Sequence, residues 1–193
     1  MSEDIRCFIA IELSREIKEA LGRVEGALKK DISGVKWVRP EGIHLTLKFL
    51  GHIEKGATGE ISGVLDKIAA GINPFKINLS SAGAFPSVER PRVIWIGVGE
   101  GAGESSGLAN TIEEKLSPLG VEKEKRAFHP HLTLARVKFP KDANALKSAL
   151  DSLRIPPAEM SAGKITLFQS VLGREGAVYS VIHESKFKNP SPA

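Results

Sequence analysis

Two of the five histidines in this 193-residue chain open the same four letters, HLTL, at residues 44–47 and again at residues 131–134. Each copy places a threonine two positions after its histidine. In a chain of this composition, a histidine is followed by a threonine at this spacing only about 0.1 times by chance. The repeat therefore indicates that the two segments share a chemical task.

The spacing of histidine and threonine suits a β-strand, in which successive side chains point to opposite faces. His44 and Thr46 then share one face of their strand, while the two leucines of the motif share the other. His131 and Thr133 do the same in the second copy. Each motif thus predicts a strand that buries leucine and presents an imidazole together with a hydroxyl.

Two imidazoles and two hydroxyls, with no carboxylate in either motif, indicate acid–base chemistry on a phosphodiester. Imidazole has an ordinary pKa of about 6.5, so near pH 7 one copy can accept a proton while the other donates one. The threonine hydroxyls can donate to the nonbridging phosphate oxygens. If two lobes face each other across a cleft, these groups converge on one substrate.

The hydrophobic pattern supplies elements that could position these motifs. A strand at IRCFIAIEL is followed by an amphipathic helix, for which Ser14 provides an N-cap. Apolar spacing predicts further helices around residues 61–68, 108–116 and 146–153. Further strands are predicted at VKWV, IHLTLKFL, FKINLSSAGAF, RVIWIGV, RAFHPHLTLARV, KITLFQSVL and AVYSVIHESKF.

The two motifs lie nearly half a chain length apart, and each is predicted on a strand that precedes a helix. This arrangement indicates a duplicated unit. We expect an α+β fold with two pseudo-symmetric lobes of antiparallel sheet, outer helices and a central cleft. We also expect residues 1–193 to form a single bilobal domain, since a chain of this length can bury a core of its own.

Three segments together resemble a known family. Residues 6–10 read R-x-F-I-A, and HLTLKFLG and HPHLTLAR follow in the same order and spacing as in the two-histidine phosphoesterases. Within them, the chain is similar to the RNA 2′,3′-cyclic phosphodiesterases, also called 2′-5′ RNA ligases. The resemblance implies hydrolysis of a terminal 2′,3′-cyclic phosphate to a 2′-phosphomonoester without a metal or other cofactor, and 2′-5′ ligation by reversal.

The resemblance also implies roles for individual residues. His44 would donate a proton to the leaving 3′ oxygen, and His131 would accept a proton from water. Thr46 and Thr133 would hold the phosphate, and Arg136 would reach it with its guanidinium group.

Strict strand alternation places Arg136 on the leucine face, so its role requires the strand to end or bulge near Ala135. Lys48, in phase with His44 and Thr46, is an alternative cation for the cleft. Phe8, Phe49 and Phe128 could stack on a base, but aromatic residues on strands usually pack in the core, and we assign them there.

Two other functions are compatible with parts of this pattern. His129 and His131, together with His44, could ligate a metal and make the protein a metal-dependent phosphohydrolase, although Pro130 disturbs the geometry. A binding module for RNA ends would need cations and stacking surfaces rather than paired imidazoles.

The segment GVGEGAGE also matches a dinucleotide-binding turn, G-x-G-x-x-A. Its glutamates would repel a pyrophosphate. We therefore interpret the segment as a flexible connection.

The cysteine count, the N-terminal sequence and the net charge indicate the cellular environment and the partners of the protein. The single cysteine, Cys7, excludes an intramolecular disulfide and favours a reducing, cytoplasmic environment. The N-terminal sequence shows neither a signal peptide nor a membrane span. A formal net charge of +4 suits a phosphate-bearing partner, and we expect a monomer that acts on RNA.

Overall fold

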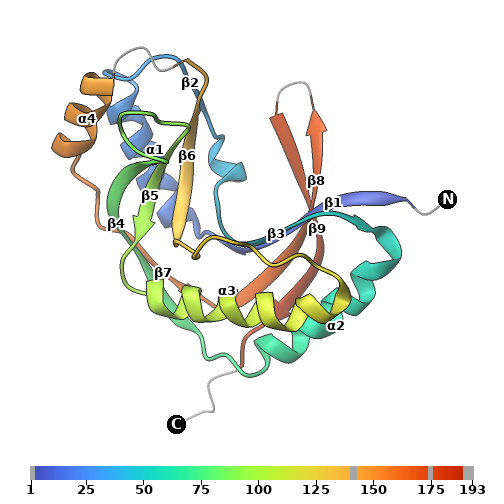
Figure 1. Cartoon of the computed structure of the whole chain (residues 1–193). Helices are drawn as coiled ribbons and strands as arrows, with labels where there is room; N and C mark the ends of the chain where they lie inside the picture. The colour runs from blue at the N-terminus through green and yellow to red at the C-terminus, as the bar shows by residue number, and fades with distance from the viewer. Residues whose placement is uncertain (1–2, 140–142, 174–175, 189–193) are drawn as a thin grey trace, which may run out of the picture.

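The computed structural model describes residues 3–139, 143–173 and 176–188 (Figure 1). These residues form an α+β fold with four α-helices, as the sequence predicts, and with nine strands, one more than the eight predicted, since the short strand at residues 159–162 was missed. The strands are β1 (Asp4–Glu12), β2 (Val35–Trp37), β3 (His44–Glu54), β4 (Phe75–Phe85), β5 (Val93–Val98), β6 (His131–Val137), β7 (Glu159–Ala162), β8 (Lys164–Gly173) and β9 (Gly176–Lys186). The helices are α1 (Arg15–Leu28), α2 (Thr58–Ala69), α3 (Ala102–Leu116) and α4 (Ala143–Ser152).

All strands join one antiparallel sheet in the order β7-β4-β5-β6-β3-β1-β8-β9, with β2 added beside β6. The two strands that carry HLTL, β3 and β6, are neighbours at its centre. Their junction is short, with a single paired position, Leu45 with Leu132. On either side of it the sheet curls upward, which gives the molecule two lobes (Figure 1).

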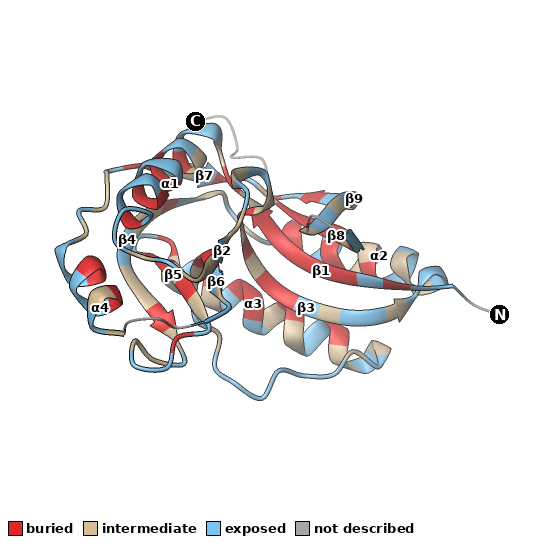
Figure 2. Cartoon of the chain, turned by 90° about the horizontal axis from the view of Figure 1, so that it is seen from above, coloured by how far each residue is buried: buried red, intermediate tan, exposed pale blue. Residues whose placement is uncertain are grey.

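The main core lies on the helical side of this sheet, and a small second cluster of Phe8, Ala10 and Phe168 lies apart from it. Helix α1 begins where the sequence predicts, because the Ser14 hydroxyl accepts from the backbone N–H of Ile17. The helices and strands turn buried faces toward each other (Figure 2). The four motif leucines contribute to this core, each at most 4% exposed: Leu45, Leu47, Leu132 and Leu134. The predicted leucine face of both motifs is therefore confirmed.

The glycine-rich segment forms the end of β5, a three-residue turn and the start of α3, where we expected a flexible connection. Gly101 has φ 83°, and a Cβ there would overlap the carbonyl oxygen of Lys76. The Asn78 side chain accepts from the backbone N–H of Glu100 at 2.9 Å. Strands β5 and β6 pair antiparallel, whereas a dinucleotide-binding turn joins parallel strands.

The helices are all amphipathic segments of a globular core. None of those that the structure describes is both long and apolar enough to cross a membrane.

Candidate active site

The register between β3 and β6 brings the two motifs together. Since Leu45 pairs with Leu132 in an antiparallel ladder, His44 lies opposite Thr133 and Thr46 lies opposite His131. The two histidines and two threonines therefore form a diagonal arrangement on one face of adjacent strands. The sequence predicts one motif in each of two lobes around a central cleft, and the structure adds that the two motif strands are neighbours in a single sheet. The curl of the sheet around its centre makes the cleft above them.

His44 is held by aromatic side chains of its own lobe. Its ring stacks on Phe8 at 4.6 Å between centroids and meets the edge of Tyr179 at 5.2 Å. Burial lowers the pKa of His44 to about 4; the positive charge of Lys18 adds to this, and a hydrogen bond with the Gly42 backbone opposes it. His44 is therefore neutral at pH 7 in the ligand-free protein.

His131 is fixed by its own backbone. Its Nδ1 lies 2.6 Å from the carbonyl oxygen of His129, and because a carbonyl can only accept, Nδ1 carries the proton. Nε2 is thus the nitrogen left for proton exchange. Burial lowers the pKa of His131, and the adjacent charge of His129 lowers it further, while the carbonyl contact raises it.

A bulge in β6 decides where Arg136 points. Ile94 pairs with Ala135 and Trp95 pairs with Thr133, so Leu134 is an extra residue between them. Ala135 is consequently buried on the leucine face, and Arg136 returns to the histidine face, where it is exposed. The bulge occurs at the place that a cleft position for Arg136 requires.

A second bulge, in β3, reverses the expected positions of the next two residues. Ala10 pairs with Thr46 and Ile9 pairs with Lys48, which leaves Leu47 as the extra residue. The interpretation of Lys48 as a cation for the cleft was therefore wrong. It is 4% exposed and turned to the helical side.

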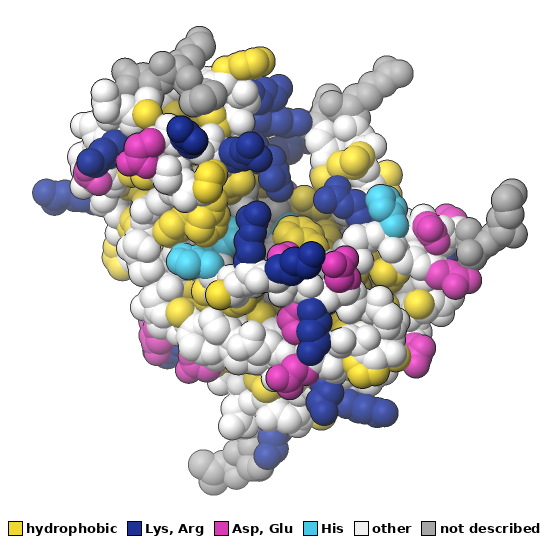
Figure 3. Space-filling view, in the orientation of Figure 1, with side chains coloured by type: hydrophobic (Ala, Val, Ile, Leu, Met, Phe, Trp, Pro, Cys, Tyr) yellow, Lys and Arg dark blue, Asp and Glu magenta, His cyan; other side chains and the backbone are white. Residues whose placement is uncertain are grey.

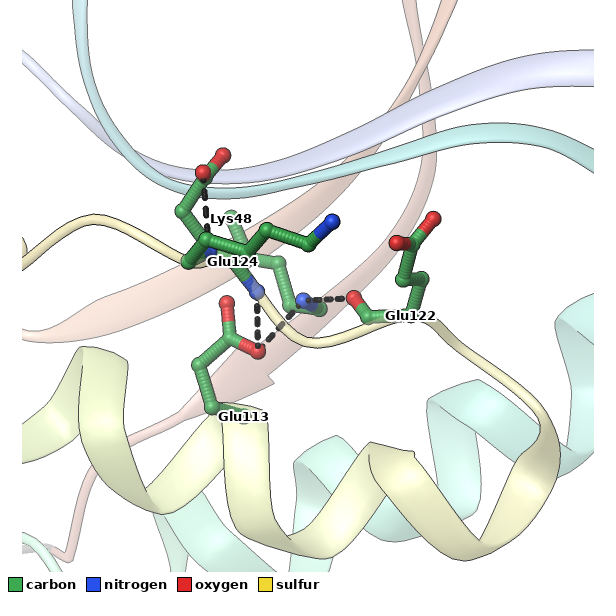
Figure 4. Close-up of polar contacts among 5 residues, drawn as sticks. Lys48, Glu113, Glu122 and Glu124 are labelled. Carbon is green, nitrogen blue, oxygen red and sulfur yellow. Dashed lines mark hydrogen bonds and ion pairs between the residues drawn. The ribbon is translucent and has the colours of Figure 1, made fainter.

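The Lys48 side chain has two polar partners on that side. Its Nζ lies 2.7 Å from a Glu113 carboxylate oxygen and donates to the Glu122 carbonyl at 2.9 Å (Figure 4). The same Glu113 oxygen accepts from the backbone N–H of Glu124. Lys48 thus ties β3 to α3 and to the segment that leads to the second motif.

The β3 bulge also brings Phe49 onto the histidine face, where its side chain is 60% exposed. Our assignment of Phe49 to the core was wrong, whereas Phe8 at 3% exposure and Phe128, packed against the main core, are core residues as predicted. The fifth residue after each histidine is therefore a cleft residue, Phe49 in one copy and Arg136 in the other. The sequence could have predicted the position of Phe49. A bulge that Arg136 requires in one repeat is expected at the same place in the other.

The cleft surface carries positive charge. Lys36 on β2 pairs with Arg136 in the register. The space-filling view shows a hollow between the lobes, with Lys and Arg side chains gathered along it (Figure 3).

A histidine metal site lacks a suitable set of ligands in residues 3–139, 143–173 and 176–188. No three His, Cys, Asp or Glu side chains there are grouped to hold an ion. The rings of His129 and His131 are 6.4 Å apart, and the Nδ1 of His131 is engaged by a carbonyl.

Comparison with known protein families finds the same internal repeat. The model of the family described as LigT-like phosphoesterase matches twice, at residues 11–95 and at residues 96–179. The chain belongs to this family. Each match contains one HLTL motif together with the bulge at the last leucine of that motif.

Curated relatives and solved structures agree with this membership. The chain is 38% identical over 180 residues to an RNA 2′,3′-cyclic phosphodiesterase of Archaeoglobus fulgidus, covering 91% of this chain and 96% of the relative. It is 36% identical over 167 residues to the enzyme of that name from Aeropyrum pernix, covering 86% and 94%. The crystal structure of TT0787 of Thermus thermophilus superposes with a TM-score of 0.80 at 27% identity, covering 95% and 98% of the two chains.

Proposed function

We propose that this LigT-like phosphoesterase hydrolyses the terminal 2′,3′-cyclic phosphate of RNA to a 2′-phosphomonoester without a metal ion. The observation that carries the proposal is the diagonal arrangement of His44, Thr46, His131 and Thr133 on one face of β3 and β6. The substrate follows from the relatives, which are named RNA 2′,3′-cyclic phosphodiesterases. Crystal structures of E. coli LigT, 25% identical to this chain, include complexes with phosphate and with NADP+.

The reaction needs one proton removed and one delivered. His131 Nε2 takes a proton from water as its oxygen bonds to phosphorus, and His44 protonates the 3′ oxygen as the P–O3′ bond breaks. Thr46 and Thr133 donate from their hydroxyls to the nonbridging oxygens, and Arg136 neutralises their charge. Neither motif leaves a carboxylate to repel the phosphate.

The lowered pKa values fit these roles once the substrate is bound. A phosphodiester anion between two neutral imidazoles favours the protonated form of either one, so substrate binding and proton uptake are linked. An imidazolium whose pKa is low is also a stronger acid toward the 3′ oxygen. Burial of His44 against Phe8 therefore tunes it toward donation.

The whole chain acts as one domain in this proposal, because the two histidines lie on neighbouring strands and neither lobe has a complete site. We further propose that the protein works as a monomer in the cytoplasm. A buried free thiol at Cys7 and an RNA substrate support this location.

The proposal is tested with protein freed of metal by a chelator and shown to be metal-free by elemental analysis. Its substrate is a short RNA that ends in a 2′,3′-cyclic phosphate, assayed in EDTA. We expect full activity and a 2′-phosphate product, identified against both isomers by chromatography. Activity that returns only with added metal, or a 3′-phosphate product, contradicts the proposal.

A further inference from the structure

An aromatic group beside His131 has no part in the hydrolysis described above. Phe85 lies with its ring 5.0 Å from that of His131, nearly perpendicular to it. The Trp95 ring is 5.1 Å from Phe85, and His129 is 5.2 Å from Trp95. We call Phe85, Trp95 and His129 the β5 platform.

The sequence around Trp95 makes room for its indole. Trp95 pairs with Gly83 on β4, and a Cβ at Gly83 would overlap the indole ring. A Cβ at Gly97 would come within 3.4 Å of the same ring and closer still to Ser81. Two glycines thus let the indole lie over the backbone of β4, on the face of the sheet that carries the histidines.

The β5 platform differs from the aromatic group around His44. There, Phe8 and Phe168 are 3% and 7% exposed, so they pack as core and orient the imidazole. In the β5 platform, Phe85 and Trp95 are half-buried and His129 is exposed. Within the part of the chain that the structure describes, Trp95 Nε1 is buried without a hydrogen-bond partner.

The position of the platform relative to the reaction identifies its ligand. Trp95 pairs directly with Thr133, so the platform adjoins the phosphate-binding residues on the side of His131, away from β3. His131 activates the attacking group in the proposed function. A group bound on the platform is therefore placed to present the attacking oxygen.

We propose that the β5 platform binds the base of a second nucleoside, whose 5′-hydroxyl replaces water in the attack on the cyclic phosphate. This inference rests on the proposed function and adds an acceptor site to it. A flat, partly open indole beside a phosphate site suits a nucleobase, because every base offers a face for stacking.

The resulting transfer is balanced. The 5′ oxygen bonds to phosphorus, and its proton passes to His131 Nε2. The P–O3′ bond breaks, and the 3′ oxygen takes a proton from His44. The product is a 2′-5′ phosphodiester with a free 3′-hydroxyl, and no oxidant, reductant or nucleotide cofactor is consumed.

Fluorescence tests the site directly, because the chain has only two tryptophans. In a Trp37→Phe, His44→Ala protein, Trp95 is the sole tryptophan and turnover is suppressed. We expect 2′-5′-linked diadenosine monophosphate to quench its emission on binding, whereas adenosine 2′-monophosphate, which has one base, quenches it much less. Calorimetry on the same samples reports binding of each ligand independently of the fluorescence.

Two results overturn the inference. If both ligands quench equally, the platform binds the base of the cyclic phosphate substrate and not that of the acceptor. If both ligands bind without quenching, no base stacks on Trp95. If the unmutated protein neither binds these ligands nor hydrolyses the cyclic phosphate, the proposed function itself is wrong. The acceptor site, which rests on that function, is then wrong as well.

Kinetics separate the acceptor site from a structural role. In Trp95→Leu, we expect the ratio of transfer, measured with adenosine as acceptor, to hydrolysis of adenosine 2′,3′-cyclic phosphate to fall about tenfold or more. Trp95→Phe should restore most of this ratio. Trp37→Leu, the same change at a tryptophan whose strand neighbour Ala135 is on the leucine face, is the matched control and should leave the ratio as in the parent. Equal losses of transfer and hydrolysis in Trp95→Leu contradict the proposal.

Discussion

The two motif histidines share a strand position but differ in environment. His44 is stacked on Phe8, whereas His131 is tied to the backbone of its own strand. The two imidazoles thus have different surroundings, as the acid and base roles proposed for them require. Each histidine should be indispensable, since neither can take both roles.

We expect His44→Ala and His131→Ala each to lower kcat for cyclic phosphate hydrolysis by about two to four orders of magnitude, the usual effect of losing a positioned acid or base. Steady-state kinetics on folded protein, checked by circular dichroism, measure this. His52→Ala is the control, because His52 is an exposed histidine on the same strand, β3. Turnover near that of the parent in either motif variant would refute paired-histidine catalysis.

The phosphate contacts should matter less than the histidines. Thr46→Val and Thr133→Val keep a branched side chain suited to a strand, and each removes one donor to the phosphate. We expect a loss of about ten- to a hundredfold in kcat/KM for each, since a hydrogen bond to a charged group contributes about 1.5–3 kcal/mol. If both variants keep parental activity and lose only thermal stability, the threonines are structural.

Arg136 tests the bulge in β6. With its guanidinium on the histidine face, Arg136→Gln should raise KM for the cyclic phosphate and reduce its dependence on salt, because one charge contact with the phosphate is lost. Lys138→Gln, an exposed cation two residues further on, is the matched control. An unchanged KM and salt dependence in Arg136→Gln would place the guanidinium outside the site.

At the level of elements, the bulges at Leu47 and Leu134 determine which residues of the HLTL strands reach the histidine face. Each lets a strand bury two successive residues and return the next one to the cleft. In β3 the buried residues are Leu47 and Lys48, and the charge of Lys48 is paired with Glu113. Because Glu113 also binds the backbone at Glu124, this ion pair connects the first motif to the approach to the second (Figure 4).

We expect Glu113→Gln to lower the free energy of unfolding by about 3 kcal/mol, because it leaves the buried ammonium of Lys48 without a negatively charged partner. The double variant Lys48→Met, Glu113→Gln should recover much of this loss, as no buried charge is left. Urea unfolding measures both. If Lys48 faced the cleft instead, Lys48→Met would raise KM for the substrate and Glu113→Gln would be close to neutral in stability.

The curled sheet as a whole sets the pH response, because it holds both histidines half-buried at its centre. The pKa of His44 in the folded protein, about 4, is below its ordinary value of 6.5. Between these values the unfolded chain binds more protons than the folded one, so stability is complete above pH 6.5 and is lost as pH falls toward 4. The loss should be on the order of 3 kcal/mol. Urea titrations at each pH should show it in the parent and much less of it in His44→Asn.

Activity should follow pH differently with and without bound substrate. The limbs of kcat/KM report the free enzyme, in which both imidazole pKa values are lowered, so we expect them below pH 6.5. The limbs of kcat report the complex, in which the phosphate anion raises these pKa values, so they should lie at higher pH. Coincident profiles for kcat and kcat/KM would show that substrate charge does not act on the histidines.

Much of this protein is determined by its sequence alone. The period of two in HLTL fixes which side chains share a face, and apolar spacing places the helices, because both depend on backbone geometry within a few residues. The duplication, the α+β class and the four central site residues were predicted on that basis. These local patterns did not establish that Arg136 and Phe49 lie in the cleft, or that Lys48 is buried.

Only the tertiary structure decides how the two repeats combine. Pairing of β3 with β6 joins residues that are far apart in the chain, and nothing within either motif specifies its partner strand or register. The bulges, like the pairing, depend on contacts between strands that are far apart in the chain. An extra residue is accommodated in a strand only where its neighbours, β1 beside β3 and β5 beside β6, and the core behind them make a break in alternation more favourable than exposing Leu47 or Leu134. The free energy that sets these positions lies in contacts between strands.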